Sequence, residues 1–320
     1  MSNLGVNGTD RITILYNVIV VGFTLIFRNR IAEYGYHLAF NLSIVLLVLL
    51  VSMSRRSRSN TPVTDTSDVP PVASGPTVPG VLSLWYPLIL YGCLYYQTGL
   101  LNTVVVPGFV DSYFLNLDVR IFGEFPGLIL SRMPGQAFFD EFFHFFYFSY
   151  YLIIPLTGIL LYRKDIKLFK SFMFQLSSLF YVCYVIYIFL PVEGPIPLRN
   201  DYYLQHGLFR TIMDFIWAKG ENPGAGFPSS HVAIAFLVAW WGSRHFQRLR
   251  IVYWLIFLFL SIATVYCMFH YAVDVMGGLC LGVLAVLLFA WTGRDSVKGF
   301  VGSRQDALKT ESSQENPSWP

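Results

Sequence analysis

The sequence is poor in charged residues. Asp, Glu, Lys and Arg make up 13% of its 320 residues, against about 25% in a typical soluble domain. Hydrophobic residues make up 55%, and the mean hydropathy is +0.54. This composition excludes an ordinary water-soluble globule and predicts an all-α, polytopic membrane protein whose core is a helix bundle. The net charge is only +3, and the basic residues form short clusters between apolar runs, so nothing indicates a nucleic-acid partner.

Cysteine is also scarce, and no cleavable leader is evident. The four cysteines lie within apolar runs and lack the spacing of metal ligands, so we interpret them as small core residues. They are Cys93, Cys183, Cys267 and Cys280. No small-residue cleavage site follows the first apolar run, which we therefore expect to stay in the membrane as an anchor.

Long apolar runs are abundant. Those that suit membrane-crossing helices of about 17–25 residues lie at about 12–27, 36–53, 82–99, 138–162, 170–190, 230–243, 251–269 and 271–292. The stretch 100–137 mixes prolines and charges with apolar patches, which predicts an interfacial or re-entrant segment instead of a full span.

The basic clusters indicate how the chain is oriented. They follow the second span, separate the fourth from the fifth and the sixth from the seventh, and follow the eighth. With alternating spans all four fall on one side, which the positive-inside rule makes cytoplasmic. Both termini are then cytoplasmic, and the loop 191–230 and the turn 269–271 face the other side. That side is the periplasm of a bacterial inner membrane or the lumen of a eukaryotic endomembrane.

Two short strings at this outer boundary carry polar chemistry. The first, Phe227-Pro228-Ser229-Ser230-His231, follows Gly226 and precedes an apolar run. Serine is a good N-cap, and a helix start presents free backbone N–H groups and the positive end of the helix dipole. This arrangement suits an anion such as phosphate.

The second string is His270-Tyr271-Ala272-Val273-Asp274. Residues four apart share one helical face, and a carboxylate beside one ring nitrogen makes the other nitrogen of a histidine a better nucleophile. A second histidine, His231, could protonate a departing oxygen. These groups suffice for phosphoryl transfer through a phosphohistidine, without a metal or another cofactor.

Two other interpretations of the same three residues stay open. They could form a structural polar network, although a carboxylate inside an apolar run is costly and by default indicates function. They could also bind zinc, but no third histidine or cysteine has helical spacing to them.

The two strings resemble motifs of a known family. Pro228-Ser229-Ser230-His231 is similar to the Pro-Ser-x-His motif of the type 2 phosphatidic acid phosphatase superfamily, and His270-x-x-x-Asp274 to its last motif. The resemblance implies a six-helix catalytic core, for which spans three to eight would serve. It divides the chain into an N-terminal two-span addition at 1–53, a flexible cytoplasmic linker at 54–81, the core at 82–292 and a disordered cytoplasmic tail at 293–320.

The resemblance also implies a role for each residue. His270 would be the nucleophile, Asp274 its orienting partner and His231 the acid for the leaving group. The phosphate oxygens would be held by Ser229, Ser230 and the glycine at position 226.

The family's arginine six positions before the last histidine is absent, because Thr264 stands there. We expect Arg199 to supply the missing positive charge, with Arg210 and Lys219 as the next candidates. The string Ala263-Thr264-Val265-Tyr266 is more similar to the inositol phosphorylceramide synthase branch.

These features predict an integral membrane enzyme that acts on a phosphate-containing lipid at the outer face. Water as acceptor would make it a phosphatase, and a hydroxyl group a phosphotransferase. The alternatives are an inositol phosphorylceramide synthase-like head-group transferase, a non-catalytic lipid-binding protein and a proton-relaying transporter. The superfamily also includes vanadate-dependent haloperoxidases. Those enzymes are soluble, so the apolar composition argues against this activity.

Overall fold

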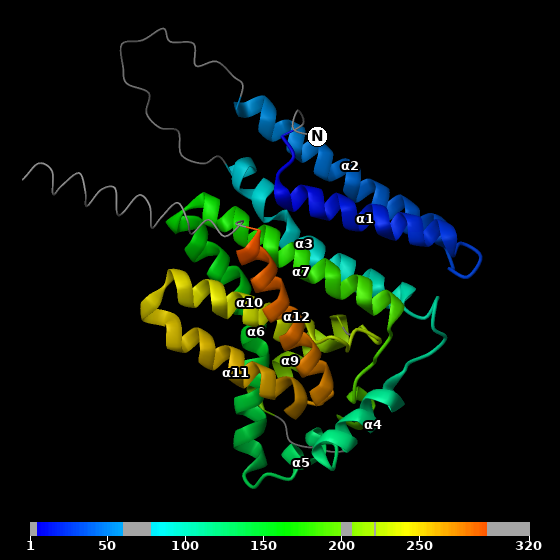
Figure 1. Cartoon of the computed structure of the whole chain (residues 1–320), viewed down its shortest axis with the longest axis vertical. Coiled ribbons are helices and arrows are strands. Elements are labelled where there is room, and N and C mark those ends of the chain that lie inside the picture. Colours follow the sequence, from blue (N-terminus) through cyan, green and yellow to red (C-terminus); the bar gives the residue numbers. More distant parts are fainter. Residues whose placement is uncertain (1–4, 60–77, 200–206, 221, 293–320) are drawn as a thin grey trace, which may run out of the picture.

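The computed structural model describes residues 5–59, 78–199, 207–220 and 222–292 (Figure 1). Within these ranges the chain is helical and has no β-strand, and an isolated bridge pairs Val192 with Ala225. The predicted all-α fold is therefore confirmed. The predicted tail and positions 60–77 of the predicted linker lie outside the described residues.

All eight predicted spans are helices, and further helices lie between them. The α-helices are α1 (Gly8–Ile26), α2 (Tyr34–Ser59), α3 (Val78–Leu101), α4 (Asp111–Phe122), α5 (Pro126–Ser131), α6 (Gln136–Lys164), α7 (Ile166–Phe189), α9 (Leu208–Gly220), α10 (Ser230–His245), α11 (Arg250–Tyr266) and α12 (Ala272–Trp291). Two 3₁₀ turns are η2 (Ile196–Leu198) and η3 (Gln247–Leu249).

Six of the described helices are long and apolar enough to cross a membrane: α1, α2, α6, α7, α11 with η3, and α12. The chain is thus an integral, multi-pass membrane protein. The other two predicted spans fall short for different reasons. Helix α10 has only 16 residues, and α3 contains Pro87 and is rich in tyrosine. Helix α10 packs inside the bundle, where a full apolar span is not required.

Helices α7 and α10 lie at the centre of the bundle. Helix α7 packs against α1, α3, α6, α10 and α12, and α10 packs against α6, α7, α11 and α12. Figure 1 shows α1 and α2 as an adjacent pair that covers the outer side of α3 and α7. Most side chains of α10 are buried, and small ones among them, such as Ala233, Ala235 and Ala239, let its neighbours approach closely.

A buried carboxylate fastens the N-terminal pair to α3. Asp10 on α1 forms an ion pair with Arg55 on α2 and accepts a 2.9 Å hydrogen bond from the hydroxyl of Tyr86 on α3. The Oγ of Ser52 donates a further bond to Asp10 at 3.0 Å. A charge inside a membrane protein is stable only when it is paired in this way.

Three shorter helices lie at one end of the bundle. Helices α4 and α5 occupy the stretch predicted to be interfacial, and with 12 and 6 residues neither crosses a bilayer. Helix α4 packs against α12, α5 against α11, and α9 against α6. Helix α9 falls within a stretch that the sequence predicted to be a loop. It forms because Met213 and Trp217, four residues apart, bury one face of an amphipathic segment.

Candidate active site

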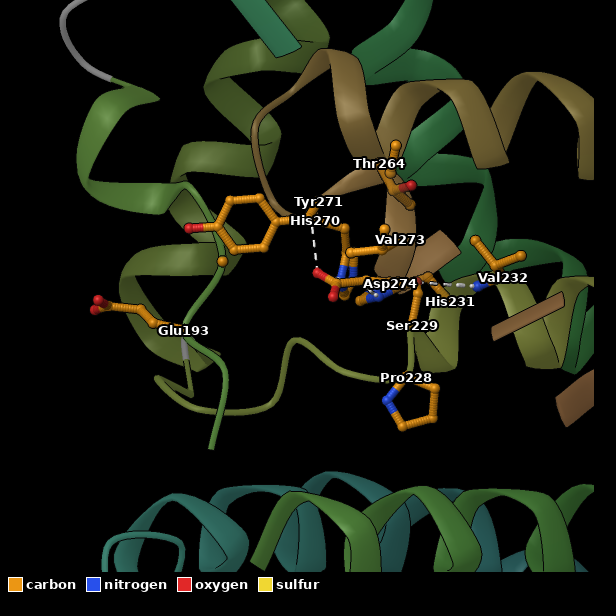
Figure 2. A network of polar contacts seen from close by, with 12 residues as sticks. Glu193, Pro228, Ser229, His231, Val232, Thr264, His270, Tyr271, Val273 and Asp274 are labelled. Atoms are coloured by element: carbon orange, nitrogen blue, oxygen red, sulfur yellow. Dashed lines mark hydrogen bonds and ion pairs between the residues drawn. The ribbon is translucent and has the colours of Figure 1, made fainter. Parts of the chain in front are cut away.

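The two predicted histidines meet at the junction of α10 and α12. His231 lies in the first turn of α10, and His270 ends the loop between α11 and α12. Their facing ring nitrogens, Nδ1 of His231 and Nε2 of His270, are 3.3 Å apart. Figure 2 labels both histidines and Asp274 in one close-up of the site. Residues separated by 39 positions in the sequence thus share one site.

Asp274 lies behind His270 and is fully buried. Its Oδ2 is 3.6 Å from Nδ1 of His270, which is longer than a hydrogen bond. The same oxygen accepts the backbone N–H of Tyr271 at 2.9 Å. Within the described part of the chain, Nδ1 of His270 and Oδ1 of Asp274 have no hydrogen-bond partner. A small rotation could therefore close this contact without breaking another bond, as often happens when a substrate binds.

The start of α10 is held by neighbouring groups. Ser229 is its N-cap, and its Oγ accepts the N–H of Val232 at 3.4 Å (Figure 2). The N–H of Ser230 is donated to the hydroxyl of Tyr187 at 3.2 Å. The N–H of Gly226 is donated to the carbonyl of Val192 at 2.6 Å. These three residues, predicted to bind phosphate, therefore already use some of their hydrogen-bonding groups in contacts within the protein.

Glycines on α12 let that helix approach the start of α10 closely. A Cβ atom on Gly278 would lie 2.3 Å from the carbonyl oxygen of Ser229. The N–H of Ser229 is in turn donated to the carbonyl of Asp274 at 3.0 Å. The close packing of α10 on α12 thus brings His231 beside the motif that carries Asp274.

Two tyrosines from α6 complete the surroundings of His231, and sequence reasoning missed both. The hydroxyl of Tyr147 is 3.1 Å from Nε2 of His231. The ring of Tyr150 packs against the same imidazole, with ring centroids 4.5 Å apart. Two tyrosines three apart on an aromatic helix gave no signal that distinguished them from packing residues.

Helix α4 fixes the backbone of the site through two carboxylates. Asp118 accepts the N–H groups of Ala272 and Val273 at 2.8 and 2.9 Å, at the start of α12. Asp111 accepts those of Glu193 and Gly194 at 2.9 and 2.7 Å. Burial raises the pKa of the Asp118 carboxyl, and its two backbone hydrogen bonds offset part of this rise.

The histidines open onto a cavity of about 800 Å³. Helices α2, α3, α6, α7, α9 and α10 all contribute to its wall, which is largely aromatic. Polar groups are fewer and include Ser230, His231, His270, Gln97 and Lys219. A large apolar cavity with a few convergent polar groups suits an amphiphilic ligand.

The three candidate cations lie in different places. Lys219 lines the cavity. The guanidinium of Arg199 lies over the rings of Trp217 and Phe269, at 4.3 and 4.8 Å from their centroids, so it sits behind two residues of the wall. Arg210 is buried beside Asp214, with Nε and Oδ2 3.5 Å apart.

Within the part of the chain that the structure describes, no group of three or more His, Cys, Asp or Glu residues is arranged to hold a metal ion. A family model described as the PAP2 superfamily matches residues 112–288, which is more than half of the chain and runs from α4 into α12. The match names no branch of the superfamily, so the similarity to inositol phosphorylceramide synthases stays a prediction. Neither a curated protein nor a solved structure matches the chain significantly.

Proposed function

The chain belongs to the PAP2 superfamily, and from this premise we propose that it removes or transfers the phosphate group of a membrane lipid. Members of this superfamily are generally phosphatases. The observation that carries the proposal is the series formed by His231, His270 and Asp274 on the wall of the large aromatic cavity.

In the proposed reaction, Nε2 of His270 attacks the phosphorus atom. The bond between phosphorus and the lipid oxygen breaks, and His231 gives its Nδ1 proton to that oxygen. Asp274 accepts the Nδ1–H of His270 and stabilises the positive ring. In the second step a water molecule or a hydroxyl group attacks the phosphohistidine, and His231 takes the proton of the attacking oxygen. The enzyme is then restored.

The cavity supports a lipid as the substrate. Aromatic side chains such as Tyr91, Tyr184 and Phe180 give an apolar wall for the chains of a lipid, and Lys219 is a cation on the same wall. Phosphoryl transfer depends on positive charge around the phosphate oxygens. The lipid would enter sideways between the helices, directly from the bilayer.

We further propose that the histidines face the non-cytoplasmic side and that both termini are cytoplasmic. His231 lies in the first turn of α10, whereas Arg244 lies in its last turn. Nζ of Lys164, at the end of α6, donates a 2.7 Å hydrogen bond to the carbonyl of His245. Two basic clusters thus meet at the end of α10 away from the histidines, which the positive-inside rule assigns to the cytoplasm.

The orientation can be tested with a membrane-impermeant maleimide on sealed cells or vesicles. Pro197→Cys, in the exposed turn η2, should react from outside, and Gln247→Cys, in η3, only after permeabilisation. The wild type, which has four native cysteines, gives the background. The opposite pattern would reverse the orientation.

The activity is tested by phosphate release in detergent with EDTA present. The substrates are phosphatidate, a prenyl diphosphate and a ceramide phosphate, each with and without inositol as an acceptor. His270→Ala should abolish product formation, whereas His245→Ala, the same change at the other end of α10, should leave it near wild type. Activity lost in EDTA and restored by a divalent ion would contradict a metal-independent reaction. Absence of product from every lipid would contradict the proposed function.

A further inference from the structure

Tyr147 extends the series of polar contacts beyond the two histidines and Asp274. The series runs from the Tyr147 hydroxyl to Nε2 of His231 at 3.1 Å, and from Nδ1 of His231 to Nε2 of His270 at 3.3 Å. Asp274 closes it at 3.6 Å from Nδ1 of His270. We propose that Tyr147 is a positioning residue that holds the imidazole of His231 with Nδ1 directed at the leaving oxygen. This inference rests on the proposed function.

The positions of the protons follow from the partners of each ring nitrogen. Asp274 lies beside Nδ1 of His270, so that nitrogen carries a proton and Nε2 keeps the lone pair that attacks phosphorus. To act as the acid, His231 must carry two protons, and the negative charge of a bound phosphate favours the second one. Its Nδ1–H faces the reaction, and its Nε2–H is donated to the oxygen of Tyr147.

The bond to Tyr147 persists through both chemical steps. When His231 gives its Nδ1 proton to the lipid oxygen, the Nε2 proton stays on the ring and remains bonded to the tyrosine. The vacant Nδ1 then faces the attacking water or hydroxyl and takes up its proton. The ring does not have to turn between the steps, and one proton leaves and returns at the same nitrogen.

A bound phosphate makes this anchor more important. A phosphate group inserted between the two histidines would replace their direct 3.3 Å contact. The bond at Nε2 would then orient the ring of His231. Tyr147 is suited to this because it is buried, and its own ring packs against Trp217 and Phe269 at centroid distances of 5.9 and 4.8 Å.

Tyr150 provides a matched control. It lies one turn further along α6 and is also buried, and its ring centroid is 4.5 Å from that of His231, compared with 4.9 Å for Tyr147. Of these two tyrosines, Tyr147 is the one whose hydroxyl lies within hydrogen-bond distance of the imidazole. Tyr147→Phe and Tyr150→Phe therefore both remove a hydroxyl beside the same ring, but only Tyr147→Phe removes a hydrogen bond to His231.

The experiment compares two esters with different needs for an acid. Dioleoyl phosphatidate releases an alkoxide that must be protonated, whereas p-nitrophenyl phosphate releases a stable phenolate. Release of diacylglycerol or nitrophenol is measured, with inositol present as an acceptor. Tyr147→Phe should lower the rate of the first turnover of phosphatidate about 10- to 100-fold, with KM changed less than about twofold. The rate of nitrophenol release in the first turnover, which precedes the step shared by the two esters, should change less than about threefold.

Retained nitrophenol release shows that the variant is folded and that His270 still attacks. Tyr150→Phe should keep the wild-type ratio of the two activities, whatever its absolute rate. An unchanged ratio in Tyr147→Phe, with both activities intact or both reduced equally, overturns the positioning role and leaves the proposed function standing. A wild type that releases neither product overturns the proposed function and this inference with it.

Discussion

The carboxylate of Asp118 caps the helix that carries Asp274. Its two oxygens accept the first free N–H groups of α12, those of Ala272 and Val273. The cap comes from α4, which lies 154 residues before Ala272 in the chain, and it is fully buried. A short helix that lies outside the transmembrane spans therefore helps to fix the start of α12, next to Asp274.

Asp118→Asn should weaken both folding and activity. An asparagine offers one acceptor oxygen to two buried N–H groups, so one of them loses its partner at a cost of about 1–3 kcal/mol. The unfolding temperature in detergent should fall, and kcat should fall with it because the start of α12 becomes less fixed. Asp165→Asn, at the exposed N-cap of α7, is the control and should change neither, since asparagine caps as well as aspartate. Equal effects of the two variants would contradict a special role for Asp118.

Gly278→Ala should separate α12 from the start of α10. The new methyl group would lie 2.3 Å from the carbonyl oxygen of Ser229, which forces the backbone of one helix to shift. We expect a loss of about 2 kcal/mol or more in the free energy of unfolding, and reduced product formation because His231 moves away from His270. Thermal unfolding and the phosphatidate assay measure the two effects.

The control for this substitution is Gly22, which lies inside α1 with open space around it. Gly22→Ala should be neutral or stabilising by about 0.5–1 kcal/mol, because alanine loses less chain entropy in a helix. A Gly278→Ala variant as stable as Gly22→Ala would show that α10 and α12 do not need their close contact.

The sequence predicted the membrane fold well because a bilayer imposes a strong local rule. Each span must be a run of apolar residues, so all eight runs could be found and all eight are helices. The two histidine motifs could also be recognised in the sequence, since each of them is short and local. Their meeting in space depended on the predicted number of spans between them, which places both at the same end of the bundle.

Other parts of the site could not be predicted, for physical reasons that differ. The cap by Asp118 and the contact of Tyr147 with His231 join residues far apart in the sequence, and neither residue type is unusual in its segment. Arg199 was predicted to supply the missing positive charge because it precedes the first motif on the same side of the membrane, and the sequence did not indicate that its guanidinium lies over two aromatic rings. That preference for an aromatic face comes from packing, which a linear pattern does not encode.

Substitutions of Lys219 and Arg199 should have different effects on substrate binding and on stability. Lys219→Gln removes a cation from the cavity wall, so KM for phosphatidate should rise about fivefold with little change in kcat. Arg199→Gln removes a guanidinium that lies over Trp217 and Phe269, so its main effect should be a loss of about 1 kcal/mol of stability. Lys167→Gln, in a basic cluster outside the cavity, controls for net charge. A rise in KM for Arg199→Gln alone would make Arg199 the phosphate ligand after all.

Phe40→Ala should test whether the N-terminal pair of helices belongs to the substrate site. Phe40 and Tyr36 on α2 line the cavity, although α2 lies outside the segment that matches the family. Removing an aromatic side chain from an apolar wall should weaken binding of an 18-carbon phosphatidate about 5- to 10-fold in KM. The kcat value should stay near wild type because the histidines lie on other elements. The dioctanoyl lipid, which fills less of the cavity, should be affected less.

Leu46→Ala is the matched control for this prediction, because Leu46 lies on the same helix but on an exposed face. It should leave the KM of both lipids unchanged. If Phe40→Ala behaves in the same way, α2 serves only as an anchor, and the cavity holds its lipid through α3, α6 and α7. If only the long-chain KM rises, the two N-terminal helices take part in selecting the substrate, which would explain why Asp10 of α1 is hydrogen-bonded to Tyr86 of α3.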